Sequence, residues 1–435
     1  MNKINLQKLL SNAKKIIPGG NQLISKRSEM FLPGLWPNFY KKAKGCSIWD
    51  LNNNHYYDFC GMGVTSCVLG YSDNEINQQI VKAIKNGSMS TLNSYEEYEL
   101  AKKLINIHPW SSMVKFTRSG GEACSVAIRI ARAYSGKDKI AICGYHGWHD
   151  WYLSLNLKNK NNLDKQLLPG LKTIGVPKSL SKTTVPFSFN DKKSFDKIIN
   201  KKIGVIIMEP MRDKLPDLDF LRHVRSTAKK INAVLIFDEI TSGFHDNYGG
   251  IHLKFGINPD IVIFGKALGN GHPISAIVGK KNIMNRSQDT FISSTMWTER
   301  VGFVAGIATL NKMKKINVQI KNINKGNYLR MKLYKVAKKY NINISICGLE
   351  SIPILKFLHK DSDRLMTYYT QEMLKVGYLA GSQIVMSSSH TQSIINQYIK
   401  AADEVFKSIS KYISSNKKVP LKGAVKHNTF KRLTT

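Results

Sequence analysis

Hydrophobic runs alternate with helical patterns through the middle of the chain. Six runs are continuously apolar, without the alternation of apolar and polar residues that marks a strand with one solvated face. Continuous runs are typical of strands buried on both faces of a parallel sheet. They cover residues 113–117, 139–144, 203–209, 233–239, 260–265 and 275–279. Helical spacing follows at 121–136, 215–232 and 300–316, and repeated strand–helix–strand order predicts an α/β fold with a mainly parallel sheet.

The two ends of the chain have a different pattern. From about residue 316 the sequence is rich in Lys and Asn, and helical stretches flank short apolar runs between 344 and 358. We expect a smaller α+β domain here, completed by the N-terminal segment. The expected division is an N-terminal segment at 1–60, a large domain at 61–315, a C-terminal small domain at 316–415 and a basic tail at 416–435.

The charge of the chain is unusual for its length. Its 435 residues are 42% hydrophobic and 22% charged, which excludes a disordered or collagen-like chain, but Lys and Arg exceed Asp and Glu by 35. Most of the basic residues are lysines, 53 against 12 arginines, and they are scattered. Specific nucleic-acid readers depend on the planar fork of Arg. The pattern therefore favours a solvated basic surface, and a non-catalytic protein that binds nucleic acid or another anion is the less favoured alternative.

Other composition features concern location. The six cysteines stand at irregular intervals without a CxxC pair, which predicts free thiols in a reducing compartment and argues against a metal knuckle. The first 17 residues lack the apolar centre of a signal peptide, and no run of 18 apolar residues occurs. We expect a cytoplasmic protein without membrane spans.

Three of the predicted strands end at residues that can do chemistry. Ser119, Gly120 and Gly121 join a strand to a helix, where unpaired N–H groups can bind a phosphate. Asp238 ends a strand, the place where open α/β sheets hold ligands, although a cap or salt bridge would also explain it. Lys266 follows another strand and precedes a Gly-rich turn. A lysine whose ammonium form is disfavoured is a nucleophile towards aldehydes, whereas an ordinary terminal lysine is the alternative.

A cluster of rings follows the strand at 139–144. Its members are Tyr145, His146, Trp148, His149 and Trp151. One of these rings could stack on a flat cofactor, or all could pack a loop onto the core. The two histidines could also ligate a metal, but no further ligand lies at a helical offset, so zinc is not expected.

In their order along the chain, these features resemble the class III, pyridoxal-phosphate-dependent aminotransferases, in the branch of glutamate-1-semialdehyde 2,1-aminomutase. The resemblance covers nearly the whole chain. It rests on the segments NAKKIIPGG, FTRSGGEA, YHG, IIMEP, LIFDEI, FGKALGNGHP and GSQIVMSSSHT. It implies a fold-type I transferase and pyridoxal 5'-phosphate as the cofactor.

The resemblance also implies roles for individual residues. Lys266 would form a Schiff base with the cofactor and move a proton, and Asp238 would keep the pyridine nitrogen protonated. The remaining cofactor-binding residues would be Ser119, Gly120 and Gly121 at the phosphate, Tyr145 and Ile240 on the two ring faces, and His146, Glu209 and Thr295. Because the threonine matching Thr295 reaches the phosphate of the neighbouring subunit in relatives, a homodimer with shared active sites is implied.

Several departures from the family pattern bear on the reaction. The phosphate turn reads Arg-Ser-Gly-Gly instead of Asn-Ser-Gly-Thr, so it loses a hydroxyl and gains a cation at Arg118. We expect Arg118 or Arg300 to bind a substrate carboxylate through bidentate geometry, with Trp148 also near the substrate. The segment after YHG is not the small Gly- and Ser-rich lid that an aminomutase needs to retain its intermediate.

These departures favour a two-substrate aminotransferase over the aminomutase. The expected mechanism is ping-pong, in which an amine or amino-acid donor leaves its amino group on the cofactor and a keto or aldehyde acceptor then collects it. The aminomutase remains the alternative. The large positive charge would then favour anionic substrates by electrostatic steering.

Overall fold

The structure, a computed structural model, describes residues 3–164, 166, 169–211 and 213–428. The chain forms two compact units, one made of Met1–Asp73 with Ile320–Thr435 and the other of Asn74–Gln319. The breaks between the units thus fall at 73 and 319, compared with 60 and 315 in the expected division.

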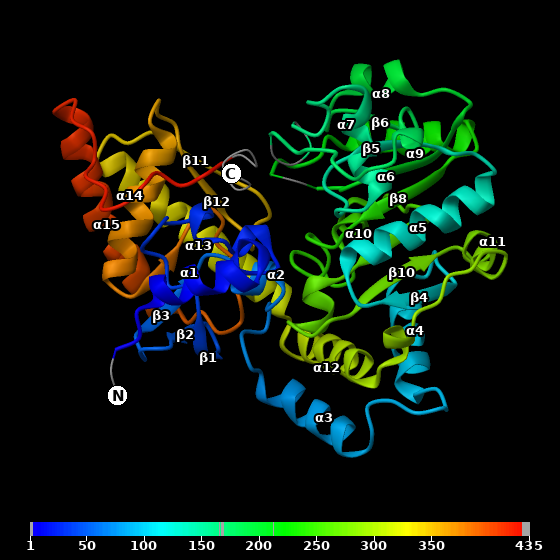
Figure 1. Ribbon diagram of the computed structural model, residues 1–435, viewed down its shortest axis with the longest axis horizontal. Helices are drawn as coiled ribbons and strands as arrows, with labels where there is room; N and C mark the ends of the chain where they lie inside the picture. The colour runs from blue at the N-terminus through cyan, green and yellow to red at the C-terminus, as the bar shows by residue number, and fades with distance from the viewer. Residues whose placement is uncertain (1–2, 165, 167–168, 212, 429–435) are drawn as a thin grey trace. The chain divides into compact units, whose positions relative to one another are not determined.

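A seven-stranded sheet forms the centre of the second unit (Figure 1). Its strand order is β4-β10-β9-β8-β7-β5-β6. Strand β10 runs antiparallel to both of its neighbours, β4 and β9, whereas the pairs β9–β8, β8–β7, β7–β5 and β5–β6 are all parallel. The strands are β4 (Met113–Thr117), β5 (Lys139–Cys143), β6 (Thr184–Pro186), β7 (Ile203–Met208), β8 (Val234–Asp238), β9 (Ile261–Phe264) and β10 (Ser275–Gly279). The predicted mainly parallel α/β sheet is confirmed.

The hydrophobic pattern predicts six of these strands to within two residues but does not predict β6. This edge strand has three residues, and the segment around it, KTTVPFS, is mostly polar. Such a short strand is recognised by its pairing with β5 rather than by its own hydrophobic pattern.

Helices surround the sheet of this unit. The largest contact is made by α5, whose buried face, with Ala123, Ala127 and Ile130, shares one core cluster with strand residues Ile207 and Ile236. The α-helices are α3 (Asn74–Lys85), α4 (Tyr95–Ile107), α5 (Gly120–Ser135), α6 (Asp150–Leu153), α7 (Leu155–Lys158), α8 (Lys192–Ile198), α9 (Leu218–Lys230), α10 (Ile251–Phe255), α11 (Lys281–Met284) and α12 (Arg300–Ile316). Short 3₁₀ helices are η4 (Lys178–Leu180), η5 (Lys266–Gly269), η6 (Asn285–Gln288) and η7 (Thr295–Thr298).

The other unit is a smaller α+β assembly. Strands β1 (Tyr40–Lys44), β2 (Ser47–Asp50), β3 (His55–Phe59) and β13 (Tyr378–Ala380) form one sheet, and β11 (Ile344–Cys347) and β12 (Ile354–Phe357) form a hairpin. Because β13 pairs with β3, the N-terminal and C-terminal parts of the chain share this sheet. The helices are α1 (Leu6–Ile16), α2 (Met62–Thr65), α13 (Val318–Lys339), α14 (Ser362–Lys375), α15 (Gln392–Ser414), η1 (Pro18–Gly20), η2 (Ile24–Lys26) and η3 (Ser28–Met30).

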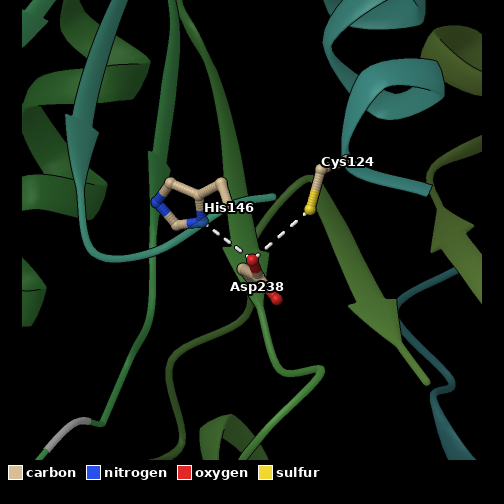
Figure 2. Close-up of side chains that lie close together, drawn as sticks. All are labelled: Cys124, His146 and Asp238. Atoms are coloured by element: carbon tan, nitrogen blue, oxygen red, sulfur yellow. Dashed lines mark hydrogen bonds and ion pairs between the residues drawn. The ribbon is translucent and has the colours of Figure 1, made fainter. Parts of the chain in front are cut away.

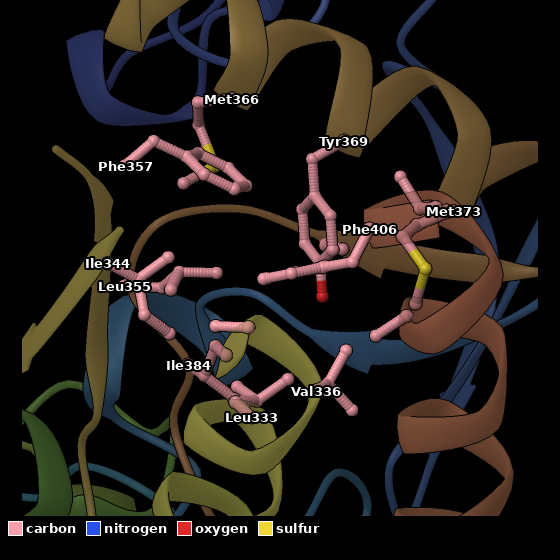
Figure 3. Packing of buried hydrophobic residues seen from close by; sticks show 14 of the residues in the cluster. Leu333, Val336, Ile344, Leu355, Phe357, Met366, Tyr369, Met373, Ile384 and Phe406 are labelled. Carbon is pink, nitrogen blue, oxygen red and sulfur yellow. The ribbon is translucent and has the colours of Figure 1, made fainter. Parts of the chain in front are cut away.

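The core of this smaller unit is one cluster of aliphatic and aromatic side chains (Figure 3). The Phe357 ring centroid lies 6.2 Å from that of Tyr369 and 5.5 Å from that of Phe406, both of which are fully buried. The rings of Tyr369 and Phe406 are 6.0 Å apart. The expected basic tail lies outside the described residues from 429 onwards. Before that point it contains no helix or strand, but Lys422 N and Lys426 N donate hydrogen bonds to side chains of α14. None of the helices in the described ranges is long and apolar enough to cross a membrane.

Candidate functional site

The carboxyl ends of six strands lie at one edge of the seven-stranded sheet, and five of these strands are followed by predicted site residues. Since β10 alone is reversed, β4, β5, β7, β8 and β9 all point the same way. Each is followed by predicted site residues: Ser119 to Gly121 after β4, Tyr145 and His146 after β5, Glu209 after β7, Asp238 at the end of β8 and Lys266 after β9. This is the edge at which open α/β sheets bind ligands. The topology therefore brings together residues that are far apart in the sequence.

Asp238 is buried beneath this edge, and its carboxylate lies between Cys124 and His146 (Figure 2). His146 Nδ1 lies 2.8 Å from Asp238 Oδ2, and the Cys124 thiol donates to the same oxygen at 3.4 Å. The other oxygen, Oδ1, accepts a hydrogen bond from the backbone N–H of Ile240 at 3.0 Å. These contacts come from three segments of the chain and hold the carboxylate in one orientation.

The atoms of Cys124, His146 and Asp238 lie close enough to bind a metal ion. However, burial and the neighbouring carboxylate raise the pKa of the Cys124 thiol well above its ordinary value. In this structure the Cys124 thiol is a hydrogen-bond donor to Asp238 Oδ2 at 3.4 Å. We interpret the cluster as support for Asp238.

Lys266 lies at the start of η5 in an unusual backbone conformation. Its φ of 41° falls in the left-handed region that residues other than glycine rarely adopt. Such strain costs on the order of 1–3 kcal/mol and is concentrated at functional positions. The Lys266 ammonium donates to Thr241 Oγ1 at 2.9 Å. Burial lowers the pKa of Lys266, opposed by the charges of Glu209 and Asp238, which increases the fraction of the nucleophilic free amine.

The turn between β4 and α5 is built for close approach of a ligand. Ser119 caps α5, and the Glu122 carboxylate accepts from the Ser119 backbone N–H at 2.8 Å in a capping box. A Cβ at Gly120 would lie 2.5 Å from Ile240 Cδ1, so a larger residue there would have to displace the Ile240 side chain. The first N–H groups of a helix have no intrahelical acceptor, which leaves the amides of Gly120 and Gly121 facing outward from the helix start. This glycine cradle, with Asp238 and Lys266 on neighbouring strands, fits a phosphorylated cofactor with a basic ring nitrogen and an aldehyde.

Three other predicted residues lie at the same edge. The backbone N–H of Tyr145 donates to Glu209 Oε2 at 3.0 Å, which joins the segments that follow β5 and β7. The Tyr145 ring is partly exposed and contacts Tyr152 edge-on. Trp148 is 71% exposed and stacks on His149 rather than on the core.

The prediction that Arg118 binds a substrate carboxylate finds no support in the structure. Its guanidinium donates to the backbone oxygens of Met296 at 2.7 Å, Trp297 at 3.0 Å and Glu299, and lies 4.8 Å from the centroid of the Phe303 ring. Its side chain is only 13% exposed. Arg118 therefore ties η7 and the start of α12 to the phosphate turn, a use that its own sequence neighbourhood does not reveal.

Arg300 is also occupied by the protein. Its guanidinium forms a bidentate ion pair with Glu96, with distances of 3.0 and 2.6 Å. Both residues line a cleft of about 520 Å³ beside α3, α4 and α12. None of the residues at the carboxyl edge of the sheet lines this cleft. The second proposed carboxylate receptor is thus also unsupported.

Three residues of the site, Cys124, Glu122 and Thr241, are not predicted from the sequence. The signal for Glu122 was available, because Ser119 followed three residues later by Glu is a capping box. Nothing in the sequence marked Thr241 as the partner of Lys266, or Cys124 as a donor to Asp238. Both contacts join residues that are distant in the chain and depend on the order of the strands.

Comparison with known proteins agrees with this site. The family model for aminotransferase class-III matches residues 33–376. The chain belongs to the class III aminotransferases. It is 33% identical over 379 residues to 3-aminobutyryl-CoA aminotransferase of Cloacimonas acidaminovorans, covering 83% of this chain and 87% of that protein. It is 31% identical to glutamate-1-semialdehyde 2,1-aminomutase of Methanobrevibacter smithii, covering 91% and 96%.

Solved structures show the same fold. The FumI protein of Sphingopyxis sp. MTA144 matches with a TM-score of 0.84 at 24% identity, covering 94% of this chain and 97% of that one. The present chain, as a class III aminotransferase, uses pyridoxal 5'-phosphate and acts on small amino donors and carbonyl acceptors. The predicted family, enzyme class and cofactor are confirmed.

Proposed function

We propose that this class III aminotransferase transfers an amino group between two separate substrates, rather than acting as an aminomutase on one. The observation that supports the proposal is the packing of the segment after Gly147. Trp151, Tyr152, Leu155 and Leu163 are buried in the core of their unit. A segment anchored in this way does not serve as the lid that would retain an intermediate between two half-reactions.

Polar contacts hold the same segment in place. Trp151 Nε1 donates to Ser125 Oγ at 3.0 Å, and the Tyr152 hydroxyl donates to the Gly144 carbonyl at 3.0 Å. Further along, the Leu163 N–H donates to Asn156 Oδ1 at 2.8 Å. Opening or closing such a segment would break these bonds and expose apolar surface, so product release without a lid is the simpler route.

The chain's own residues divide the work at the site. Bound pyridoxal phosphate supplies an electron-accepting ring and an aldehyde that can exchange for an amino group. Lys266 would hold the cofactor through Nζ and, once displaced by the donor, move a proton at Nζ. Asp238 would hold the ring nitrogen in its protonated form, with His146 and Cys124 fixing the carboxylate.

The amides of Gly120 and Gly121 would bind the phosphate, and Tyr145 and Ile240 would flank the ring. Ser119 and Glu209 would position the loops that carry these residues.

A two-part assay tests the proposed reaction. Purified holoenzyme is mixed with single amines or amino acids, and cofactor absorbance reports whether the visible band is lost. A carbonyl acceptor added afterwards should restore the band and yield the aminated product, because the two half-reactions are separable. Glutamate 1-semialdehyde given alone is the contrasting substrate. Its conversion to 5-aminolevulinate through many turnovers, without any acceptor, would contradict the proposal and favour the aminomutase.

We also propose a homodimer whose subunits complete each other's sites. Thr295 lies in η7 on an exposed surface with Phe291, 85% exposed, and Met296, 60% exposed. Exposed apolar residues next to a threonine that resembles the family's phosphate ligand support a subunit contact here. Light scattering on the purified protein should give about twice the chain mass of 49.1 kDa. A monomer at micromolar concentration that retains full activity would contradict shared sites.

A cytoplasmic location is proposed on the cysteine chemistry. All six cysteines are free thiols, and five of them are buried. Free thiols are the rule in reducing compartments, whereas disulfides form and persist in oxidising ones.

A further inference from the structure

His149 lies directly against the phosphate turn. A Cβ placed on Gly121 would be 2.9 Å from His149 Cε1 and 3.2 Å from Nδ1, so the imidazole occupies the space that a side chain at position 121 would fill. A Cβ at Gly147 would in turn be 3.0 Å from Gly121 Cα. The segment after β5 therefore packs onto the first turn of α5, and the ring of His149 replaces the side chain that Gly121 lacks.

The His149 imidazole is held in place by stacking, but its Nδ1 atom makes no hydrogen bond. Trp148 stacks on the ring with centroids 4.3 Å apart and planes 18° apart. His149 Nδ1 is shielded from solvent and has no hydrogen-bond partner among the described residues. Although His149 precedes α6 as its N-cap residue, its side chain makes no capping hydrogen bond. A buried imidazole nitrogen without a partner is costly unless a ligand supplies one.

The chemistry around Nδ1 suits an anion. Ser119 N is taken by Glu122, whereas Gly120 and Gly121 present the remaining amides of the first helical turn. Burial lowers the pKa of His149, opposed by the charges of Glu122 and Asp150, so the neutral ring, with one N–H to donate, is favoured near neutral pH. The family pattern has a threonine at position 121, and this chain has lost that hydroxyl.

We propose that His149 is a direct ligand of the cofactor phosphate, donating from Nδ1 beside the amides of Gly120 and Gly121. The imidazole takes over the place of the missing hydroxyl, and Trp148 fixes its orientation. This assignment rests on the proposed function only in placing the phosphate at this turn. It makes the residue pair Gly121 and His149 a unit, in which the small residue creates the space that the ring fills.

The test compares His149→Ala and His149→Asn with the wild-type enzyme. Apoprotein is titrated with pyridoxal 5'-phosphate and separately with pyridoxal, and cofactor absorbance gives the two dissociation constants. Loss of a hydrogen bond to a charged phosphate should weaken binding of the phosphorylated form about 10- to 100-fold in His149→Ala. Binding of pyridoxal should change less than about twofold. His149→Asn, whose amide can donate from a similar position, should recover most of the affinity.

A second measurement uses ³¹P NMR to detect the cofactor phosphate directly. The ³¹P resonance of the bound cofactor should shift between wild type and His149→Ala, while peptide mapping shows the cofactor still attached to Lys266. His223→Ala serves as a control, because that histidine pairs with Asp196 on the surface of α8 and α9. It should leave both dissociation constants and the ³¹P resonance unchanged.

Three outcomes would overturn the assignment. These are unchanged affinity for pyridoxal 5'-phosphate in His149→Ala, an equal loss for pyridoxal and its phosphate, and a ³¹P resonance that does not move. An equal loss would mean that the ring only supports the turn. Failure of the proposed function gives a different result, because the wild-type enzyme would then bind the cofactor at Lys266 without separable transfer to an acceptor.

Discussion

Replacing Lys266 with alanine should lower the rate of amino transfer by about 100- to 10,000-fold, the range expected when a positioned proton-transfer group is removed. The structure supports this because Lys266 Nζ is the basic group at the carboxyl edge of β9, held by Thr241 at 2.9 Å. The backbone of Lys266, with φ at 41°, is strained, and such strain is found mainly at residues that serve a function. The variant should stay folded, because the side chain contributes one hydrogen bond, to Thr241, and lies at the edge of the sheet rather than in its hydrophobic core.

The measurement has to distinguish one lysine among 53. Borohydride reduction of the holoenzyme followed by peptide mapping should place the cofactor on Lys266, and the visible band should be absent in Lys266→Ala. Lys280→Ala is the matched control, because Lys280 follows β10 and pairs with Asp260 at 2.7 Å, away from the carboxyl edge. A reduced adduct at another lysine, or full activity in Lys266→Ala, would contradict the assignment.

The lowered pKa of Lys266 gives this prediction a pH dependence. The free amine is the form that attacks a carbonyl, so covalent capture of pyridoxal phosphate by the apoprotein should become faster as pH rises. Because burial lowers the pKa, the midpoint should lie below the ordinary lysine value of about 10.4. A midpoint at or above that value would show that Glu209 and Asp238 outweigh burial.

The sequence was sufficient to predict the positions of the residues that stand at the ends of strands. Asp238 and Lys266 each follow a continuous apolar run, so their strand positions were predictable, and the parallel order of β8 and β9 then places them at one edge. Ser119 and Gly120 were recognisable for the same reason. These predictions needed only local hydrophobic pattern and one topological rule.

The sequence could not assign the arginines. Arg118 stands in the phosphate turn and Arg300 opens α12, and both positions suggested a substrate contact. In the structure, Arg118 holds backbone oxygens about 180 residues away and Arg300 pairs with Glu96. A guanidinium has five donors, and which acceptors reach it depends on tertiary packing that a local pattern does not contain. The same limit hid Cys124, whose thiol meets Asp238 only because α5 crosses the sheet.

The contacts that hold the Asp238 carboxylate in place lead to the second prediction with a large expected effect. Asp238→Asn should lower kcat by about 100- to 1000-fold, a loss typical of removing one preorganised charge from a reacting centre. Asparagine keeps the size of the side chain but cannot balance a protonated ring nitrogen. Steady-state kinetics together with the pH dependence of cofactor absorbance would measure the change. We expect the absorbance to respond to pH differently from wild type, because the ring nitrogen loses its anionic partner.

A control variant and a double variant decide whether the loss of kcat comes from the site at Asp238 or from a general loss of stability. Asp260→Asn changes another buried carboxylate, which pairs with Arg225 at 2.9 Å before β9, and should lower thermal stability while leaving kcat intact. Cys124→Ala should reduce kcat in the wild-type background but have little further effect in Asp238→Asn, because the thiol acts through that carboxylate. Additive losses in the double variant would mean that Cys124 serves the core instead. Undiminished kcat in Asp238→Asn would remove Asp238 from the mechanism altogether.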